Sequence, residues 1–488
     1  MKKLIYSITI LSLFMTSCVS DNEDFNENKD SAYNVPAETL LSNSQKALSD
    51  QLTNPNVNVG AIFRYFPQYL AATQYTGESR YRISSRAIAD RHWRNLYGTV
   101  LGGLESVKKI IPTEVAPTGV SDAQFQIEQQ NKLAITDIFE VYTYQILVDS
   151  FGNIPYTESL NSTNVLPKYD DAAEVYSKLI IRLDAAIAKL DTSKKSFASG
   201  DIVYSGDVTK WKLFANSLKL KLAVNLIDTN PTLAKTTIEN AYNSGVILTN
   251  ANNASFKYAL SAPNYNPIYE TLVADNRNDF VPTSIIVDAM NTLNDPRRTK
   301  YFTALEDGSY KGGRYGYTNI YQNFSHVNPI LTAPDFSSQF MEAAEVNFYL
   351  AEAASNGISV GNTTQYYYDK AITASFESWG IANQAAAYLL NPSVNFTTAP
   401  GSSAKEKIGK QEWIAFYNRG FESWTSYRRL DFPALVAPAS AYSEAEGQIP
   451  KRLTYPSNER TVNGENYTAA SSAIGGDVLK NHIFWDKF

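Results

Sequence analysis

The only cysteine in this 488-residue chain, Cys18, lies in a sequence typical of lipid attachment. Lys2 and Lys3 precede an uncharged apolar run that ends at Met15, and two small residues separate this run from Cys18. A short positive head and an apolar run of this length are typical of a secretory leader, and the run is too short to span a bilayer. The processing enzymes of bacterial lipoproteins recognise an apolar residue and two small residues before a cysteine, which they acylate. Residues 1–17 are therefore predicted to be a leader, with Cys18 as the acyl acceptor.

Met15 stands where leucine is usual in such motifs, and the alternative is an ordinary secreted protein with an unrelated cysteine in its leader. Three acyl chains would make attachment permanent, since each buried methylene contributes about 0.8 kcal/mol. No later apolar run reaches the length of a membrane span, so we expect an anchored protein. Residues 18–34 are polar and acidic, which predicts a flexible tether. With no other cysteine, the folded part must depend on its core rather than on disulfides.

The residue types that commonly perform catalysis form no recognisable pattern. His92, His326 and His482 lie far apart, and a zinc site of cysteine and histidine is excluded because the chain has one cysteine. Neither a Gly-x-Ser-x-Gly elbow nor a phosphate-binding P-loop is present. A pair of carboxylates could hydrolyse a glycoside, but spacing singles out no two of the 49 acidic residues. We therefore predict no enzymatic activity, no cofactor and no metal site.

The overall charge and the aromatic content indicate the kind of partner. The net charge is −6, the isoelectric point is about 5.4, and no basic cluster occurs, which argues against nucleic acid. Aromatic residues make up 12% of the chain, led by 32 tyrosines. Tyrosine combines an apolar face with a hydrogen-bonding tip, so this composition favours a binding surface.

Aromatic residues are concentrated in a loop-rich stretch between about residues 250 and 338. This stretch is rich in Asn, Pro, Gly, Tyr and Asp, with one clear helix at 282–293. Residues 311–329, KGGRYGYTNIYQNFSHVNP, have the composition of a long irregular loop. Loops of this length are usually functional or disordered, and the aromatic content argues against disorder.

The elements that must position these loops are helices with aromatic stripes. Apolar residues recur at helical spacing in seven segments: 90–112, 121–152, 169–191, 207–228, 338–357, 363–380 and 407–433. Ser121 is predicted to cap its helix, and Gly380 is predicted to follow the end of another. Three stripes are interpreted as helix-packing core: Trp211, Phe214, Leu218 and Leu222; Tyr368, Ile372, Phe376 and Trp379; Trp413, Tyr417, Phe421 and Trp424. The helix pairs recur at intervals loosely like those of tetratricopeptide repeats.

Several of these segments together resemble one protein family. FMEAAEVNFYLAEAASNG followed by YYYDKAITASFESWG, WKLFANSLKLKLA, the LNDPR turn, and IGKQEWIAFYNRGFESWTSYRRLDFP with RLTYPSNE resemble blocks of the SusD/RagB family, SusD-like subgroup. The blocks cover about residues 90–460 in the order of the family. In the LNDPR turn, Arg297 and Arg298 are predicted to pair with carbonyls or carboxylates at a helix end.

The resemblance implies a mainly α-helical fold and a role in nutrient capture. Members of the family are outer-membrane lipoproteins on the cell surface that bind oligosaccharides, or peptides in the RagB branch. They form a lid on a SusC-like TonB-dependent transporter. The implied fold is a scaffold of tetratricopeptide-type helix pairs with irregular ligand-binding loops. We expect a single domain at 35–488, with scaffold at 35–250 and 338–430, a loop-rich capping region at 250–338 and C-terminal loops at 431–488.

The resemblance, together with the need of sugars for stacking faces and planar polar partners, yields candidate ligand-binding residues. They are Tyr75 and Tyr81 in an early loop, and Tyr265, Tyr269, Arg277, Asn278, Asp279, Tyr315, Tyr317, Tyr321 and Phe324 in the capping region. Trp93 is interpreted as core. We predict an oligosaccharide-capturing lipoprotein attached to the outer membrane through acylated Cys18 and facing the cell exterior. The alternatives are a peptide-capturing RagB-type protein, a surface glycoside hydrolase and a pure interaction scaffold.

Overall fold

The computed structural model describes residues 35–56, 58 and 60–487. The predicted leader, Cys18 and the tether, residues 1–34, lie outside these residues. One compact unit begins at Ala37. Among the described residues, no helix is long and apolar enough to cross a membrane. The chain is mainly α-helical, which confirms the predicted fold class.

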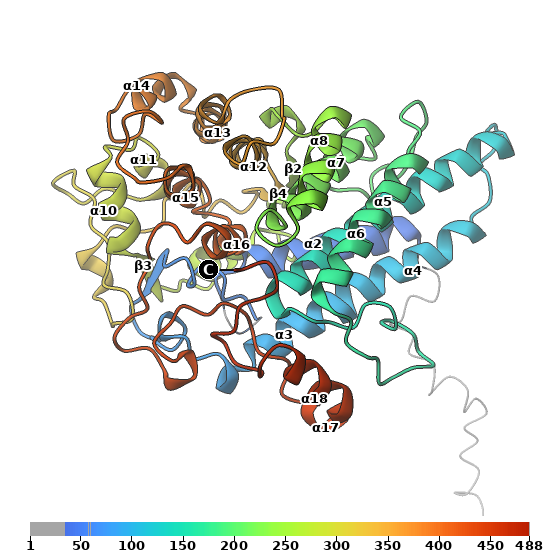
Figure 1. The fold of residues 1–488 in the computed structure, drawn as a ribbon, viewed down its shortest axis with the longest axis horizontal. Coiled ribbons are helices and arrows are strands. Elements are labelled where there is room, and N and C mark those ends of the chain that lie inside the picture. Colours follow the sequence, from blue (N-terminus) through green and yellow to red (C-terminus); the bar gives the residue numbers. More distant parts are fainter. Residues whose placement is uncertain (1–34, 57, 59, 488) are drawn as a thin grey trace, which may run out of the picture. The chain divides into compact units, whose positions relative to one another are not determined.

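The first half of the unit consists of helices that pack as consecutive pairs, α2 with α4, α5 with α6, and α7 with α8 (Figure 1). Their bounds are α2 Ala37–Thr53, α3 Ile88–Arg94, the π-helical η4 Asn95–Leu101, α4 Gly102–Ile110, α5 Asp122–Phe151, α6 Ala172–Lys189, α7 Val208–Asn225 and α8 Pro231–Ser244. Capping side chains start four of them, with Asn230 at α8, because an Ncap oxygen satisfies a free backbone N–H. Ser121, as predicted, accepts from the Gln124 N–H at the start of α5, and Asp171 and Asp207 cap α6 and α7.

The second group of helices begins after residue 342 and packs in the same manner. It comprises α12 Ala343–Ser355, α13 Thr364–Ser378, α14 Ala385–Leu389, α15 Ala404–Ala415 and α16 Gly420–Leu430, in the orange part of Figure 1. α12 packs against α13, α15 and α7, so it joins the two groups of helices. Gly380 follows the last turn of α13 with φ +70°, the predicted left-handed position.

Two helix predictions in this region were wrong in part. Residues 338–357 were expected to be one helix, but Ser338–Met341 forms strand β4, and the helix begins at Ala343. Residues 407–433 were also expected to be continuous, but α15 ends at Ala415 and α16 begins at Gly420. At Gly420 an added Cβ would lie 2.6 Å from the backbone of Phe63, so this close approach requires glycine.

The stretch from 250 to 338 contains short elements between long connections. Strand β2 Ala254–Phe256 pairs antiparallel with β4, and β1 Leu70–Ala72 pairs antiparallel with β3 Phe280–Pro282. The predicted helix in this stretch is α10 Ser284–Thr292, capped by Thr283. Shorter helices in this stretch are α9 Pro267–Tyr269, the π-helical η7 Glu270–Ala274 and α11 Arg298–Tyr301. Toward the C-terminus lie α17 Glu459–Val462 and α18 Gly464–Ala473. Single 3₁₀ turns are η2 Glu78–Arg80, η3 Ser84–Arg86, η5 Ile111–Thr113, η6 Asn250–Asn252, η8 Tyr321–Asn323, η9 Ala382–Gln384 and η10 Ser443–Ala445.

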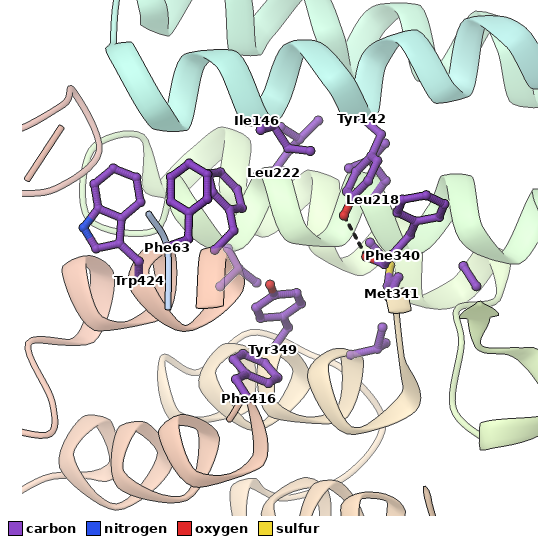
Figure 2. Close-up of a cluster of buried hydrophobic side chains, with 14 of the residues drawn as sticks. Phe63, Tyr142, Ile146, Leu218, Leu222, Phe340, Met341, Tyr349, Phe416 and Trp424 are labelled. Atoms are coloured by element: carbon purple, nitrogen blue, oxygen red, sulfur yellow. Dashed lines mark hydrogen bonds between the residues drawn. The ribbon is translucent and has the colours of Figure 1, made fainter. Parts of the chain in front are cut away.

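The core forms where the two groups of helices meet. Figure 2 shows Tyr142 of α5, Leu218 of α7, Phe340 of β4 and Trp424 of α16 among its buried side chains, and the Tyr142 hydroxyl donates to the Phe340 carbonyl at 2.8 Å. All three aromatic stripes pack in the core as predicted, with Trp379 partly buried at its edge. Trp93 is also packed against the core.

The Asp-Pro-Arg turn before α11 is structural. Arg297 is fully buried and forms an ion pair with Asp295 at 2.6 Å, and it also donates to Ser375 and Gln411. The predicted pairing with a carboxylate is confirmed for Arg297. Every donor group of this guanidinium must find a partner, because it is removed from water.

A buried ion network connects α7, α12 and α16. Lys221 of α7 is fully buried, contacts Glu422 of α16, and lies 3.4 Å from Glu345 of α12. Arg419, just before α16, is 2.6 Å from Glu345 and 3.7 Å from Glu422. Burial alone would raise the pKa of Glu345, but Arg419 and Lys221 together hold it below its usual value. Two cations thus face two buried carboxylates on separate helices, and a third buried carboxylate, that of Glu342, lies 3.6 Å from Arg419.

A second cluster lies further along the same helices. Arg429 of α16 is 3.0 Å from Glu352 of α12 and 3.6 Å from Glu412 of α15. Burial raises the pKa of Glu412 to about 7, and the proximity of Glu352 adds to this rise, although Arg429 opposes it. Glu412 is therefore the carboxylate that this cluster neutralises least.

We expect Lys221→Met to destabilise the protein by about 3–5 kcal/mol, because it leaves Glu345 and Glu422 buried with Arg419 as their remaining cation. Urea unfolding followed by circular dichroism measures the change. Lys235→Ala is the control, because it removes an exposed ion pair with Glu239 on α8 and should leave stability nearly unchanged. Equal, small effects of both substitutions would contradict the role assigned to the network.

Stability should also depend on pH through Glu412. Because its folded-state pKa is raised, the folded chain binds this proton more readily than the unfolded chain. The corresponding stabilisation is present below the usual value near 4.5 and is lost as pH rises to about 7, with a slope of at most about 1.4 kcal/mol per pH unit. We expect Glu412→Gln to flatten the dependence of the urea midpoint between pH 5 and 7, whereas Glu406→Gln should not, because the bond to Lys410 lowers the pKa of Glu406 and it is ionised throughout this range.

Candidate functional site

The pairing of β1 with β3 brings an early loop to the capping region. Leu70 pairs with Pro282 and Ala72 with Phe280. Directly beyond the strands, the Thr73 N–H donates to the Asp279 carbonyl at 2.8 Å. All six strand residues are buried, so apolar burial fixes this register. The loop after residue 73 and residues 277–279 are therefore held side by side, although about 200 residues separate them.

A cleft of about 50 Å³ lies at this junction, and we refer to it as the tyrosine cleft. It is lined by Pro55, Asn56, Asn58, Tyr65, Tyr75, Glu78, Arg86, Thr271, Arg277, Asp279 and Phe280. Of the predicted site residues, the structure brings Tyr75, Arg277 and Asp279 together here. Tyr75 is 57% exposed, so its ring remains available to a ligand.

Two pairs of oppositely charged side chains lie in the lining of the tyrosine cleft. Arg277 Nε donates to Asp279 Oδ2 at 2.6 Å, and this bond raises the pKa of Arg277. Glu78 is 3% exposed, and its Oε1 lies 3.3 Å from Arg86 Nη2. Among the described residues, no hydrogen bond satisfies this oxygen, which is therefore a buried acceptor at the edge of the cleft.

Tyr65 and Phe280 also line the tyrosine cleft. Burial raises the pKa of Tyr65, and the charges of Glu78 and Asp279 raise it further. Its hydroxyl therefore stays protonated and remains a donor. An exposed ring, carboxylate acceptors, guanidinium donors and a phenol donor meet in this cleft, a combination suited to binding a hydroxyl-rich or amide-rich ligand.

Two predicted ligand contacts, Tyr81 and Tyr315, prove to be buried. Tyr81 is fully buried, accepts a hydrogen bond from Gln68 Nε2 at 3.1 Å, and packs with its ring 6.2 Å from that of Tyr315. Tyr315 is 6% exposed, and its hydroxyl donates to the Tyr65 carbonyl at 2.5 Å. Both residues therefore support Tyr65 from behind the cleft, and neither presents a face to it.

The loop at 311–325 contacts the same strands through Asn319, whose amide nitrogen donates to the Ala72 carbonyl at 2.9 Å. Its aromatic residues pair within the loop. The Arg314 guanidinium lies 3.5 Å from the Tyr317 ring centre, Tyr321 stacks on His326 at 3.8 Å, and Lys311 lies 5.4 Å from the Phe324 ring centre. Each of these rings is partly exposed and lies outside the lining of the cleft.

The remaining predicted residues are Tyr265, Tyr269 and Asn278. The two tyrosine rings meet edge to face at 5.2 Å, and the Asn278 carbonyl accepts from the Thr73 hydroxyl. None of the three lines the cleft.

Sequence reasoning missed Tyr65, Glu78, Arg86 and Phe280. The position of Glu78 three residues after Tyr75 was the only local signal for any of them.

Within the described part of the chain, no group of histidine, cysteine, aspartate and glutamate could hold a metal ion. His92 is fully buried against Ser150, and burial lowers its pKa to about 3, so it is neutral. His326 stacks on Tyr321, and His482 contacts Asp486 at 3.1 Å. The three histidines therefore have separate structural surroundings.

The helix pairs and the long loops between them match a known family. Residues 28–456 match the model of a family described as starch-binding and associating with the outer membrane, the SusD-like family. The chain belongs to this family, which comprises binding proteins and not enzymes. No protein of curated function matches the chain in sequence.

Solved structures support the same assignment. A SusD homologue from Bacteroides uniformis is 28% identical, with 92% of this chain and 99% of that chain covered and a TM-score of 0.74. A chitin-binding SusD homologue from Flavobacterium johnsoniae is 25% identical, with coverage of 92% and 96% and a TM-score of 0.73. A SusD-like protein from Bacteroides thetaiotaomicron, 24% identical with coverage of 92% and 98%, has a TM-score of 0.77 and shows the shared fold.

Proposed function

We propose that this chain is a surface-exposed outer-membrane lipoprotein that captures oligosaccharides and delivers them to a SusC-like TonB-dependent transporter. Membership of a family described as starch-binding and outer-membrane-associating supports this proposal. So does the similarity to a chitin-binding homologue. Acylated Cys18 would attach the chain to the bilayer, and the acidic residues after it resemble an export signal to the cell surface.

The observation that carries the choice of ligand site is the tyrosine cleft. Tyr75 offers an exposed ring face for the C–H surface of a sugar. Glu78, Asp279 and Arg277 offer planar acceptors and donors for its hydroxyls. Capture requires only moderate affinity because the ligand must be passed on, and a Kd near 1 μM corresponds to about −8 kcal/mol.

Peptide capture, as in the RagB branch, is the second candidate. The charges of Glu78, Arg86, Arg277 and Asp279 would suit peptide amides and charged termini. A pure interaction scaffold would bind the transporter without a small ligand. Calorimetry of the protein against matched panels of neutral oligosaccharides and peptides separates these three functions.

We expect Tyr75→Ala and Glu78→Gln each to weaken oligosaccharide binding about tenfold or more. The first removes the stacking face, and the second removes a buried charged acceptor worth about 1.5–3 kcal/mol. Isothermal titration calorimetry of the purified protein measures the effect. Tyr366→Ala is a matched control, because Tyr366 is 43% exposed on α13 and lies outside the cleft.

The Tyr317→Ala, Tyr321→Ala double variant tests the other aromatic group. Loss of binding in this variant, with Tyr75→Ala unaffected, would move the site to the 311–325 loop. Binding of peptides and no oligosaccharide would replace the primary proposal with the second candidate.

We expect Cys18→Ala to release a folded protein from the membrane, because the acyl acceptor is removed. Fractionation of cells, with metabolic labelling by a radioactive fatty acid, measures attachment, and circular dichroism checks the fold. Labelled, membrane-bound protein in the variant would contradict lipid attachment at this residue.

A further inference from the structure

A larger groove adjoins the tyrosine cleft and contains none of the predicted site residues. It has a volume of about 650 Å³ and lies between α2, the end of α3 with η4, and the start of η7. We refer to it as the polar groove. Its lining residues are Asn43, Lys46, Ala47, Asp50, Gln51, Asn54, Asn58, Arg91, Arg94, Asn95, Gly98, Thr99 and Glu270. No aromatic residue is among them, so stacking cannot be the mode of binding.

Both π-helical segments of the described chain border the polar groove. The segment η4 contributes Asn95, Gly98 and Thr99, and η7 contributes Glu270. A π-helical turn is rare, and such turns are frequently found at functional sites. Their presence on two walls of one groove is an indication of function that is independent of its charge.

Two arginines one helical turn apart, Arg91 and Arg94, contribute positive charge to the polar groove. Arg91 donates one bond, from Nη1 to the Arg86 carbonyl at 2.7 Å, and its other N–H groups remain available. Arg94 is exposed and has no partner among the described residues. Lys46 is paired with Asp50 at 2.5 Å. Among the described residues, no carboxylate pairs with Arg91 or Arg94, so these two guanidinium groups are the unpaired cations of the groove, whose lining also includes the carboxylate of Glu270.

Amide side chains make up most of the remaining lining. Gln51 is 2% exposed, and its oxygen accepts from Asn95 Nδ2 at 3.0 Å. Its amide nitrogen is buried and has no hydrogen-bond partner in the described part of the chain. An unpaired buried donor beside a free guanidinium favours an acceptor-rich ligand group.

The polar groove and the tyrosine cleft share a wall. Asn58 lines both, and its side-chain oxygen accepts from Arg86 Nη2 at 3.0 Å. Asn54 and Glu270 line the polar groove, while the residues that follow them in sequence, Pro55 and Thr271, line the cleft. A ligand longer than one residue could therefore occupy both.

We propose that the polar groove is a second subsite that binds an oxyanion-bearing sugar residue, so that the ligand of this protein is an acidic oligosaccharide. The inference rests on the proposed function and specifies its substrate class. The tyrosine cleft holds one sugar by stacking, and Arg94 with Arg91 holds the anionic group of a neighbouring sugar through charge-assisted hydrogen bonds. A carboxylate of a uronic acid and a sulfate ester share this chemistry.

The test uses the full-length protein, purified in a mild detergent, and calorimetry with four probes. They are a neutral chitin hexasaccharide, a hexagalacturonate, a sulfated hexasaccharide and an acidic hexapeptide. We expect one of the two acidic oligosaccharides to bind at least tenfold more tightly than the neutral one, with affinity falling as sodium chloride is added. Whichever of these two acidic probes binds shows whether the anionic group of the ligand is a carboxylate or a sulfate.

Arg94→Gln should weaken binding of that acidic oligosaccharide at least tenfold and reduce its salt dependence. Folding is not at risk, because Arg94 has no partner among the described residues. Arg460→Gln, on α17, removes the same charge from a side chain that is 61% exposed and should have no effect.

Each other outcome overturns the inference in a distinguishable way. Binding that is lost in Tyr75→Ala and unchanged in Arg94→Gln would leave the proposed function standing and remove the second subsite. Tighter binding of the neutral hexasaccharide than of either acidic oligosaccharide would also leave the proposed function standing and remove the second subsite. If only the acidic peptide binds, and its binding depends on Arg94, the proposed function and the second subsite both become those of a peptide-capturing protein. If no probe binds, the proposed function and the second subsite are both wrong.

Discussion

The fold depends on neutralising charges that its helices bury at their common interface. Glu345, Glu422 and Lys221 are on three different helices, and each is almost inaccessible to water. A carboxylate removed from water is strongly unfavourable unless a cation and hydrogen bonds accompany it. The helices must therefore pack in the register that places Lys221 and Arg419 against both carboxylates. A shift of one turn along α12 would separate these partners and leave buried charges unpaired.

This constraint extends to strand β4 and to the segment that leads into the site. Arg419 also donates to the Phe340 carbonyl in β4 at 3.0 Å, so the ion network fixes the strand as well as the helices. The Phe63 backbone packs against Gly420, at the start of the helix that carries Glu422. The segment after Phe63 leads directly into β1, whose pairing with β3 forms the tyrosine cleft. The position of the cleft thus follows from the packing of α16.

The sequence predicted the helices well because their apolar period is a local property. It predicted one helix in place of α15 and α16 because Trp413, Tyr417, Phe421 and Trp424 keep the helical period across the break. The break itself arises from the contact of Gly420 with a segment more than 350 residues earlier. Strand β4 was missed for a similar reason, since four residues that pair with β2 carry too short a pattern to separate strand from helix.

The residues that line the cleft could be predicted from the sequence only where the type of residue, in a loop, was enough to suggest a ligand contact. Tyr75, Arg277 and Asp279 were found as an exposed aromatic and two charged residues in loops. Glu78 and Arg86 were missed, because their place in the cleft depends on the pairing of β1 with β3, which links distant segments. For the same reason Tyr81 and Tyr315 could not be recognised as buried. The polar groove is a composite of α2, η4 and η7, and its amide residues have no distinctive spacing.

The abundance of tyrosine was taken as favouring a binding surface, yet much of it serves the fold. The hydroxyls of Tyr142, Tyr301 and Tyr368 donate to backbone carbonyls of Phe340, Ile414 and Val394, all from buried positions. The three acceptors lie in strand β4, near the end of α15 and in the loop after α14, so these bonds join separate elements of the fold. No cysteine lies among the described residues, so contacts of this kind, rather than disulfides, join these elements. The rings that remain exposed in the described chain, Tyr75 among them, are a small remainder, so a high tyrosine content is a poor guide to the extent of a binding surface.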